Sequence, residues 1–282
     1  MRAEAMPALC VVVSTYNQPD WLEKVLLGFA AQTFADFELI VADDGSREDT
    51  RARIDALRPR LPYALRHVWH PDDGFRKCVI LNRAIEASRA DYLVFTDGDC
   101  IPRADFLEVH ARERRPRRFL SGGYVKLPRA LSHAIGADHI AAGRHCDPAW
   151  LATQGFTDFR QRLKLGARGA VASALNLLAP ARASWNGHNA SGWKADLVAA
   201  NGFDERMQYG GEDRELGERL EHAGIRGLRV RYSAIVVHLD HDRGYVRPEM
   251  LENNRRIRAE TQARRATRTA FGLVREDRPA GA

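Results

Sequence analysis

Two aspartates stand two positions apart at the end of an apolar run in this 282-residue chain. The run from Tyr92 to Phe95 leads into Asp97 and Asp99, with only Gly98 between them. Carboxylates at this spacing on a turn can present oxygen atoms to Mg²⁺ or Mn²⁺, which prefer oxygen ligands. The alternative is a solvated turn whose aspartates accept hydrogen bonds from the local backbone. The pattern therefore indicates either a divalent metal site or an ordinary polar turn.

A second pair of carboxylates, Glu212 and Asp213, follows the turn Tyr209-Gly210-Gly211. The two residues open an expected helix, where their negative charges face the positive end of the helix dipole. One interpretation is helix capping by Asp213. The other is a general base, presented beside a glycine turn that leaves room for a substrate.

Two histidines close the last apolar run of the chain, His238 at its end and His241 three residues later. A histidine at the end of a strand is more often structural than functional. With a pair of carboxylates elsewhere in the chain, a neutral imidazole becomes a candidate further metal ligand. The sequence leaves open which of the two histidines would serve.

The first hundred residues alternate between strand and helix patterns. Continuous apolar runs, typical of strands covered on both faces, are separated by segments with one apolar helical stripe. We expect strands at 8–15, 37–46, 63–70 and 91–99, and helices at 17–32, 47–61 and 76–89. This order predicts right-handed βαβ units in an open parallel sheet, with ligands bound beyond the carboxyl ends of the strands. The polar turns that follow the first, second and fourth strands should therefore converge on one edge.

The second half of the chain has a less regular pattern. We expect a strand around a Gly-Gly turn at 118–127, mixed helix and loop at about 130–185, and a helix at 213–225. One long strand is expected at 228–239, and one basic helix from about Val246. A boundary between the regular half and the second half is expected near 101–105. The chain is thus divided into residues 1–104, 105–245 and 246–282.

Composition and motifs exclude several classes of protein. A hydrophobic fraction of 45% and a charged fraction of 28% are ordinary for a globular protein. The four scattered cysteines form no zinc-type or Cys-x-x-Cys spacing, which favours a reduced, cytosolic chain. We find no signal-peptide pattern and no apolar run of about 18 residues that could span a membrane. The first expected strand is followed by neither a dinucleotide-binding glycine motif nor a P-loop, which argues against a dinucleotide-dependent oxidoreductase.

The net charge of +6 suits an anionic partner. Basic residues gather in two places: the segment 159–185, which has no acidic residue, and the arginine-rich tail from about Val246. Each is either a solvated helix face or a surface that contacts an anionic membrane. Nucleic acid is not expected as a partner, because no aromatic residues are interleaved with the arginines. Asn189 begins an Asn-Ala-Ser glycosylation sequon, to which we assign no role.

Four motifs, taken in order along the chain, resemble inverting family-2 glycosyltransferases of the GT-A fold. The segments 11–49 and 74–85 are similar to the opening of that family, and 91–102 resembles its Asp-x-Asp motif. The segment 187–220 is similar to the Gly-Gly-Glu-Asp region of a galactosyltransferase-type C-terminal half. The resemblance implies an α/β, Rossmann-like, mostly parallel sheet flanked by helices, with a mixed acceptor-side half and a basic C-terminal helix. Residues 1–104 would then bind the nucleotide sugar, and 105–245 would bind the acceptor and hold the catalytic groups.

The resemblance also implies roles for individual residues. Those on the nucleotide-sugar side are Thr15, Tyr16, Asp43, Asp44, Arg76, Lys77, Asn82, Asp97 and Tyr209. Asp213 corresponds to the base, and Glu212 to a residue that bonds the acceptor or donor sugar. Asp97, Asp99 and His238 would hold Mn²⁺ or Mg²⁺, with His241 as the alternative to His238. Where the family often has tryptophan before Gly-Gly, this chain has tyrosine, so the resemblance does not identify which sugar is transferred.

The implied activity is metal-dependent transfer of a sugar, with inversion, from a nucleotide donor of the UDP type. The implied acceptor is a carbohydrate or glycolipid in bacterial surface polysaccharide or lipopolysaccharide synthesis. The chain would act in the cytoplasm, with peripheral contact to the inner face of the cytoplasmic membrane as an open alternative. Two other functions remain: a nucleotidyltransferase, which also uses paired aspartates, and a nucleotide-sugar-binding module without catalysis.

Overall fold

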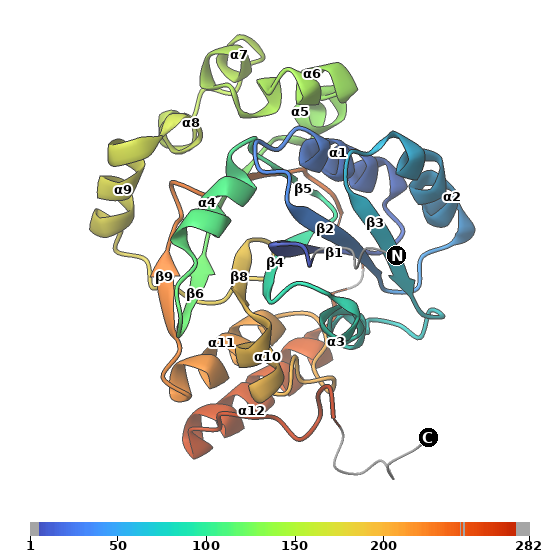
Figure 1. The fold of residues 1–282 in the computed structure, drawn as a ribbon, viewed down its shortest axis with the longest axis vertical. Helices are drawn as coiled ribbons and strands as arrows, with labels where there is room; N and C mark the ends of the chain where they lie inside the picture. Colours follow the sequence, from blue (N-terminus) through green and yellow to red (C-terminus); the bar gives the residue numbers. More distant parts are fainter. Residues whose placement is uncertain (1–5, 243, 245, 275–282) are drawn as a thin grey trace.

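A seven-stranded sheet runs through the centre of the computed structural model, which describes residues 6–242, 244 and 246–274 (Figure 1). Its strand order is β3-β2-β1-β4-β8-β6-β9. The strands are β1 (Leu9–Thr15), β2 (Phe37–Asp43), β3 (Ala64–Trp69), β4 (Tyr92–Asp97), β6 (Arg118–Ser121), β8 (Ala190–Trp193) and β9 (Arg226–Arg229). Only β8 runs antiparallel to its neighbours in this sheet. The expected α/β fold with a mostly parallel sheet is confirmed.

Side chains of β1 alternate between two hydrophobic cores, one on each face of the sheet. Leu9, Val11 and Val13 belong to one core, and Cys10 and Val12 to the other. Successive side chains of a strand point to opposite faces, so a strand covered on both sides must be apolar throughout. This is why the run reads as continuous valine-rich sequence and not as an alternation.

Helices cover both faces of the sheet (Figure 1). One core is shared with α1 (Pro19–Ala30), α2 (Glu48–Leu57) and α4 (Phe106–Glu113), and the other with α3 (Lys77–Ala87), α10 (Lys194–Ala199) and α11 (Glu212–His222). Pro19 occupies the first turn of α1, where its missing N–H is not needed. A short 3₁₀ turn at Arg58–Arg60 follows α2 and contains Pro59.

A second, three-stranded sheet consists of β5 (Cys100–Pro102), β10 (Ile235–His238) and β7 (Gly123–Lys126). Asn189 links it to the large sheet, because it immediately precedes β8 and its side chain reaches the small sheet. Its amide nitrogen donates to the carbonyls of Gly123 at 2.8 Å and Ala234 at 3.0 Å, and the residue is fully buried.

The expectation of one long strand at 228–239 is wrong. The chain turns at 230–234, where the N–H groups of Ser233 and Ala234 both donate to the carbonyl of Val230. β9 and β10 therefore lie in different sheets. The strand expected at 118–127 likewise becomes β6 and β7, which also belong to different sheets. Both strand pairs pass from the large sheet to the small one.

Short helices connect β7 to β8. They are α5 (Arg129–Ala134), α6 (Ala137–Ala141), α7 (Pro148–Thr153), α8 (Phe159–Gly166) and α9 (Gly169–Leu178), with a 3₁₀ turn at Arg144–Cys146. They form an arc along one side of the molecule (Figure 1). Among the described residues, no helix combines the length and the apolar character needed to cross a bilayer.

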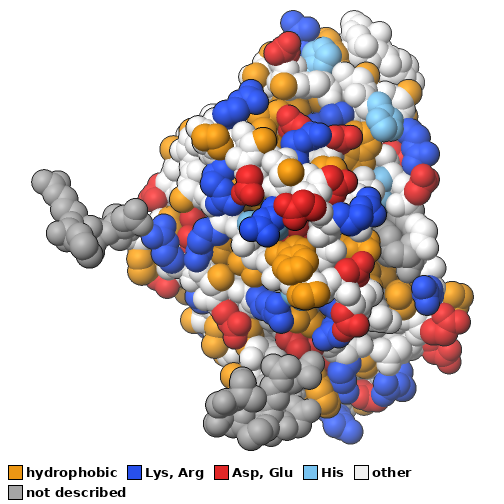
Figure 2. All heavy atoms as spheres, turned by 90° about the vertical axis from the view of Figure 1, so that its right-hand side faces the viewer, with side chains coloured by type: hydrophobic (Ala, Val, Ile, Leu, Met, Phe, Trp, Pro, Cys, Tyr) orange, Lys and Arg blue, Asp and Glu red, His pale blue; other side chains and the backbone are white. Residues whose placement is uncertain are grey.

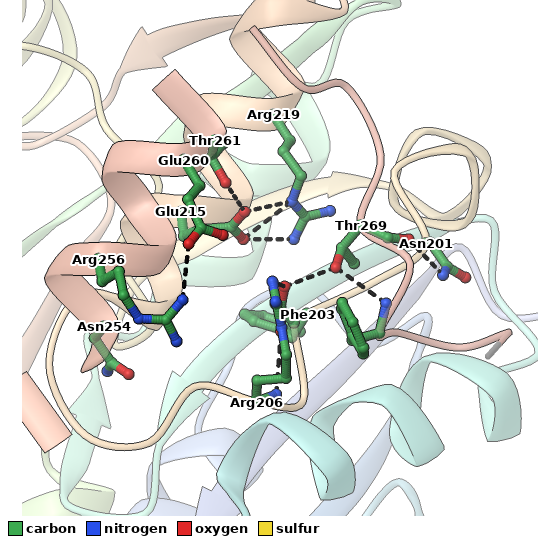
Figure 3. Close-up of polar contacts among 12 residues, drawn as sticks. Asn201, Phe203, Arg206, Glu215, Arg219, Asn254, Arg256, Glu260, Thr261 and Thr269 are labelled. Carbon is green, nitrogen blue, oxygen red and sulfur yellow. Dashed lines mark hydrogen bonds and ion pairs between the residues drawn. The ribbon is translucent and has the colours of Figure 1, made fainter. Parts of the chain in front are cut away.

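The basic tail begins with α12 (Pro248–Arg264), which packs on α11. Glu215 of α11 accepts hydrogen bonds from Arg219 of the same helix and from Thr261 of α12 (Figure 3). Side chains of Glu215 and Arg219 are each 1% exposed. Arg219 also donates to the carbonyls of Ala200 and Gly202. α12 is therefore fastened to the helix that carries Glu212 and Asp213. Residues 275–282 of the expected tail lie outside the described residues.

The large sheet crosses the expected boundary at residue 104. β8, β6 and β9 come from the second part of the chain and extend the four strands of the first. The two parts therefore share one sheet and both hydrophobic cores.

Candidate active site

A cavity of about 880 Å³ opens at the carboxyl ends of β1 and β4. This size suits a small ligand. Its wall includes residues 14–18, 97–99, 187–188 and 208–213, together with Asp44, Lys77, Tyr124, Lys126, His238 and His241. The turns that the sequence predicts to converge on one edge thus meet in one cavity, joined by segments from the second half of the chain.

Lys77 lies between the two carboxylate pairs. Its ammonium donates to Asp97 Oδ1 at 2.7 Å, and Ser14 Oγ donates to the same oxygen at 2.8 Å. Burial disfavours the charge on Lys77, but the carboxylates of Asp97, Glu212 and Asp213 outweigh it and raise the lysine's pKa. Burial likewise opposes the charge on Asp97, but Lys77 lowers the pKa of that carboxyl overall. The charge of Asp97 is therefore balanced by a protein cation.

Asp99 faces the two histidines. Its Oδ2 lies 2.8 Å from His241 Nε2 and 3.7 Å from His238 Nε2, and the imidazole rings are stacked with centroids 5.6 Å apart. The Nδ1 atom of His238 is buried and has no hydrogen-bond partner among the described residues. Burial raises the pKa of Asp99, but the hydrogen bond from His241 and the charge of His238 lower it overall.

This donor set fits a divalent cation. Ligand atoms of Asp99, Cys100 and His238 lie within 4.8 Å of one another. The Cys100 thiol donates to Asp99 Oδ1 at 3.2 Å, and burial raises its pKa well above the usual range, so it remains a thiol. Carboxylate and imidazole ligands suit Mn²⁺, whereas a protonated thiol is a poor ligand. Asp99 and His238 are thus the residues that would hold the metal, with His241 also in reach of the same carboxylate.

Glu212 and Asp213 begin α11 directly after two glycines with positive φ, Gly210 at 106° and Gly211 at 93°. L side chains rarely adopt the φ of Gly210, which explains the glycine there. Asp213 Oδ2 accepts a hydrogen bond from the Gly187 N–H at 3.0 Å. Glu212 Oε2 accepts one from the Gly210 N–H at 2.9 Å. Both carboxylates are held by backbone donors at the cavity wall.

The two carboxylates differ in environment. Burial and then the neighbouring Asp213 raise the pKa of Glu212 to about 7. Near neutral pH Glu212 is therefore partly protonated and can donate a hydrogen bond. Asp213 instead accepts hydrogen bonds from the backbone on both oxygens, from the Gly187 N–H at 3.0 Å and from the Arg214 N–H at 2.7 Å.

The glycine turn is held from behind by Asn254 of α12. This residue is fully buried, and its amide nitrogen donates to the carbonyls of Gln208 at 2.8 Å and Gly210 at 3.2 Å. Its carbonyl oxygen accepts from the Gln208 N–H at 3.2 Å. The C-terminal helix thereby fixes the turn that presents Glu212 and Asp213, which the sequence patterns did not indicate.

Three of the residues expected to bind the nucleotide lie together on the cavity wall. They are Thr15, Tyr16 and Asp44. Tyr16 is 42% exposed, and its hydroxyl donates to Asp72 at 2.9 Å. Asp44 lies 2.8 Å from His70 Nε2 and accepts from the Arg76 N–H at 3.0 Å. Burial raises the pKa of Asp44 to about 6, although these hydrogen bonds oppose the shift.

Three other expected nucleotide residues do not line the cavity: Asp43, Arg76 and Asn82. The fully buried Asp43 accepts from the Ser46 N–H and contacts His67 Nε2, both at 2.8 Å. Arg76 pairs with Asp73 at 2.6 Å. Asn82 exchanges two hydrogen bonds with the backbone of Phe203, so it ties α3 to the loop after α10. Their positions support the loops and the helix that flank the cavity.

Tyr209 does lie on the cavity wall, edge-to-face with Phe75 at 6.0 Å between ring centroids. His188, Tyr124 and Lys126 also line the cavity, although the sequence analysis did not single them out. Burial lowers the pKa of His188 to about 4, so its imidazole is neutral. The ring of Tyr124 packs against it at 4.7 Å. Their only sequence signal was proximity to motifs: His188 is the second residue of the segment 187–220, and Tyr124 follows the Gly-Gly turn.

Two models of known protein families match parts of this chain. Residues 10–114 match the model of "Glycosyl transferase family 2", and residues 180–242 match that of the "N-terminal domain of galactosyltransferase". Over residues 10–114 the chain is therefore similar to glycosyltransferase family 2. The two matched segments supply the strand-end turns on one side of the cavity and the 208–213 turn on the other.

One curated relative is a validoxylamine A glucosyltransferase of Streptomyces hygroscopicus subsp. jinggangensis, 31% identical over 235 residues. The alignment covers 78% of this chain and 53% of the relative, so this chain spans about half of that protein's length.

Solved structures show the same fold. The mannosyltransferase PcManGT from Pyrobaculum calidifontis, in complex with GDP-Man and Mn²⁺, has a TM-score of 0.57 at 20% identity. That match covers 86% of this chain and 59% of the other. S. aureus TarS 1–349 in complex with UDP-GlcNAc has a TM-score of 0.58 at 17% identity, covering 89% of this chain and 65% of the other. The expected GT-A fold is therefore confirmed.

Proposed function

We propose that this protein transfers a hexose, with inversion, from a nucleotide sugar to a hydroxyl of a carbohydrate or glycolipid acceptor. The observation that carries the proposal is the meeting of Asp97, Asp99 and His238 with Glu212 and Asp213 in one cavity. One set of groups suits a metal and diphosphate, and the other suits removal of a proton. We further assign residues 1–104 mainly to the donor and 105–245 mainly to the acceptor.

On the donor side, Thr15, Tyr16 and Asp44 are placed to contact the base and ribose. Lys77 lies beside Asp97, where its ammonium can bond a phosphate oxygen. Tyr209 offers an aromatic face to the sugar. Asp43, Arg76 and Asn82 act on the donor indirectly, through the loops and the helix they hold.

Asp99 and His238 are the residues we assign to Mn²⁺ or Mg²⁺, with Asp97, which also lines the cavity, as the third expected ligand. A divalent ion bound there would supply Lewis-acid neutralisation of the diphosphate leaving group. Support comes from the carboxylate–imidazole donor set and from the Mn²⁺ in the mannosyltransferase complex.

Asp213 is assigned as the general base. It accepts the proton of the acceptor hydroxyl as that oxygen attacks the anomeric carbon. A new carbon–oxygen bond forms while the bond between that carbon and the diphosphate breaks, and the nucleoside diphosphate leaves with the bonding electrons. Glu212, partly protonated near neutral pH, holds a sugar hydroxyl. A single displacement from the opposite face inverts the configuration.

A UDP donor is supported by the TarS complex with UDP-GlcNAc, whereas the mannosyltransferase holds GDP-Man. We place the reaction in the cytoplasm, in bacterial surface polysaccharide or lipopolysaccharide synthesis. The match of residues 10–114 to the family-2 model disfavours the nucleotidyltransferase alternative. The non-catalytic binding module remains as the function to be tested against transfer.

The test combines donor binding with turnover. Nucleotide sugars are first screened by thermal shift with Mn²⁺ and with EDTA, since a ligand of the native state raises the melting temperature. Turnover of the best donor is then measured for Asp213→Asn and for Asp138→Asn, a control on exposed α6 outside the cavity. We expect Asp213→Asn to lose about 10²–10⁴-fold in turnover while donor binding persists. Donor binding without turnover in the unmodified protein would favour the binding module.

A further inference from the structure

The outer surface of α8 and α9 is the largest gathering of exposed apolar side chains that the described residues contain. Eleven large hydrophobic residues are exposed among the described residues, and five of them lie on α8 and α9. They are Phe159 (73% exposed), Leu163 (42%), Val171 (59%), Leu177 (76%) and Leu178 (77%). Scattered exposed apolar residues are normal, but a contiguous group marks an interaction site.

Helical geometry places these side chains on one side of each helix. In α9 the buried Ala172 and the half-buried Asn176, which bonds Ser233 and Tyr232, face the protein. Val171, Leu177 and Leu178 lie on the opposite side, since each residue advances by about 100° around the axis. In α8 only Leu165 is buried, while Phe159 and Leu163 share an exposed stripe one turn apart. Each helix therefore contacts the rest of the protein through only a few of its side chains.

Basic side chains predominate on this surface. Residues 159–185 contain no aspartate or glutamate, and their cations are Arg160, Arg162, Lys164, Arg168 and Arg182. Arg168 pairs with Asp105 at 3.5 Å and Arg182 pairs with Glu221, which leaves Arg160 and Arg162 as the cations beside the apolar stripe. Arg160 and Arg162 flank the Phe159–Leu163 stripe on either side. A helix with an apolar stripe bordered by arginine and lysine has the pattern that binds in the interface of an anionic bilayer. It contrasts with the face around α2, where acidic and basic side chains are interspersed (Figure 2).

The same surface adjoins the cavity. Lys164 of α8 donates to the carbonyl of Tyr124 at 2.8 Å, and its ammonium lies 5.5 Å from the centre of that ring. Tyr124 lines the cavity. α8 thus contacts a residue of the cavity wall through Lys164.

The arginine-rich tail is the weaker candidate for the same role. Arg258 of α12 pairs with Glu218, and Arg256 pairs with Glu260 at 2.7 Å. Its buried residues are Asn254, Ile257 and Thr261, and it has no exposed large hydrophobic side chain. Both basic regions are thus partly neutralised, and the difference between them is that α12 offers no apolar stripe to a membrane.

We propose that α8 and α9 dock this protein on an anionic lipid bilayer. The apolar residues enter the interface, and the surrounding cations contact lipid phosphates. An acceptor attached to lipid would then reach the cavity past Tyr124. This last step rests on the proposed transferase function, whereas the docking itself does not.

The experiment measures binding of the purified chain to vesicles in the absence of donor and acceptor. Vesicles of phosphatidylcholine alone are compared with vesicles that also contain phosphatidylglycerol, by flotation. We expect binding only to the anionic vesicles, weakened by salt. Leu177→Glu combined with Leu178→Glu should weaken it by about a hundredfold. Val198→Glu, at a residue of α10 that is 46% exposed, is the matched control and should bind normally.

A second pair of variants separates the two basic regions. Arg160→Gln should weaken binding about fivefold, whereas Arg255→Gln on the exposed side of α12 should leave it unchanged. Near-native melting temperatures would show that the variants fold. The proposal is overturned if anionic vesicles are not bound, if Leu177→Glu with Leu178→Glu binds normally, or if only Arg255→Gln weakens binding. It is equally overturned if the wild type is a dimer that this double variant converts to a monomer. Transfer activity enters none of these readouts, so failure here leaves the proposed function standing.

Discussion

The negative charge of Glu212 is expected to destabilise the folded protein, and replacing Glu212 with glutamine measures this effect. The residue is 8% exposed, and burial followed by the Asp213 charge raises the pKa of its carboxyl from 4.5 to about 7. The folded protein therefore holds this proton more tightly than the unfolded chain does. Stability is lost as the pH rises between these two pKa values. The difference between them corresponds to about 3 kcal/mol.

Glu212→Gln removes the charge but keeps an oxygen that can accept the hydrogen bond from the Gly210 N–H. We expect the variant to raise the free energy of unfolding by about 3 kcal/mol near pH 8. Near pH 5 the gain should be below about 1 kcal/mol, because the wild-type carboxyl is then protonated in the folded protein. If Glu212 holds a sugar hydroxyl, turnover should fall while stability rises.

The measurement is urea-induced unfolding of the metal-free protein at both pH values, with the slope of each transition compared. Glu252→Gln, at an exposed position of α12, is the matched control and should change stability little at either pH. An equal gain at both pH values would show that the effect does not come from ionisation. A loss of stability near pH 8 would refute the proposed environment of Glu212.

Three further outcomes follow from the contacts described above. Asp99→Asn should abolish the Mn²⁺-dependent part of the thermal shift given by a nucleotide sugar; an undiminished shift would place the metal elsewhere. Asn254→Ala leaves backbone groups of the 208–210 turn unpaired, so it should lower turnover and cost about 1–3 kcal/mol in urea unfolding, with donor affinity preserved; normal turnover would show that α12 does not position the turn. Arg219→Met strands the buried Glu215 carboxylate and should cost about 3–5 kcal/mol. Arg256→Met, which breaks the more exposed pair of Arg256 and Glu260, should lower the free energy of unfolding by less than about 1 kcal/mol. Similar costs for the two variants would contradict this reasoning.

Local pattern was sufficient for the first half of the fold. Runs such as Leu9–Thr15 are fully buried, so their composition reports their position directly. The prediction of one strand at 228–239 was wrong because the two parts of this run belong to different sheets. The turn at 230–234 separates them. A turn made by backbone hydrogen bonds, without proline or glycine, has no strong sequence signal.

The site was predictable where one loop carries it and less so where distant segments meet. Asp97, Asp99, Glu212 and Asp213 stood out by their spacing, and the structure brings them into one cavity. Adjacent aspartates were not separable, because side-chain direction decides that Asp44 lines the cavity and Asp43 does not. The support of the glycine turn by Asn254 depends on contacts between residues 44 and 46 positions apart, which no local pattern reveals.

The link between the two sheets has a consequence for the sequon at Asn189. Attachment of an oligosaccharide requires the side-chain amide nitrogen to reach solvent. In the folded protein this nitrogen is committed to the carbonyls of Gly123 and Ala234, deep between two β-layers. A glycan on it would force the layers apart, so the tripeptide cannot be modified once the chain has folded. Here the asparagine of an Asn-x-Ser motif holds two sheets together by hydrogen bonds and is not a site for glycan attachment.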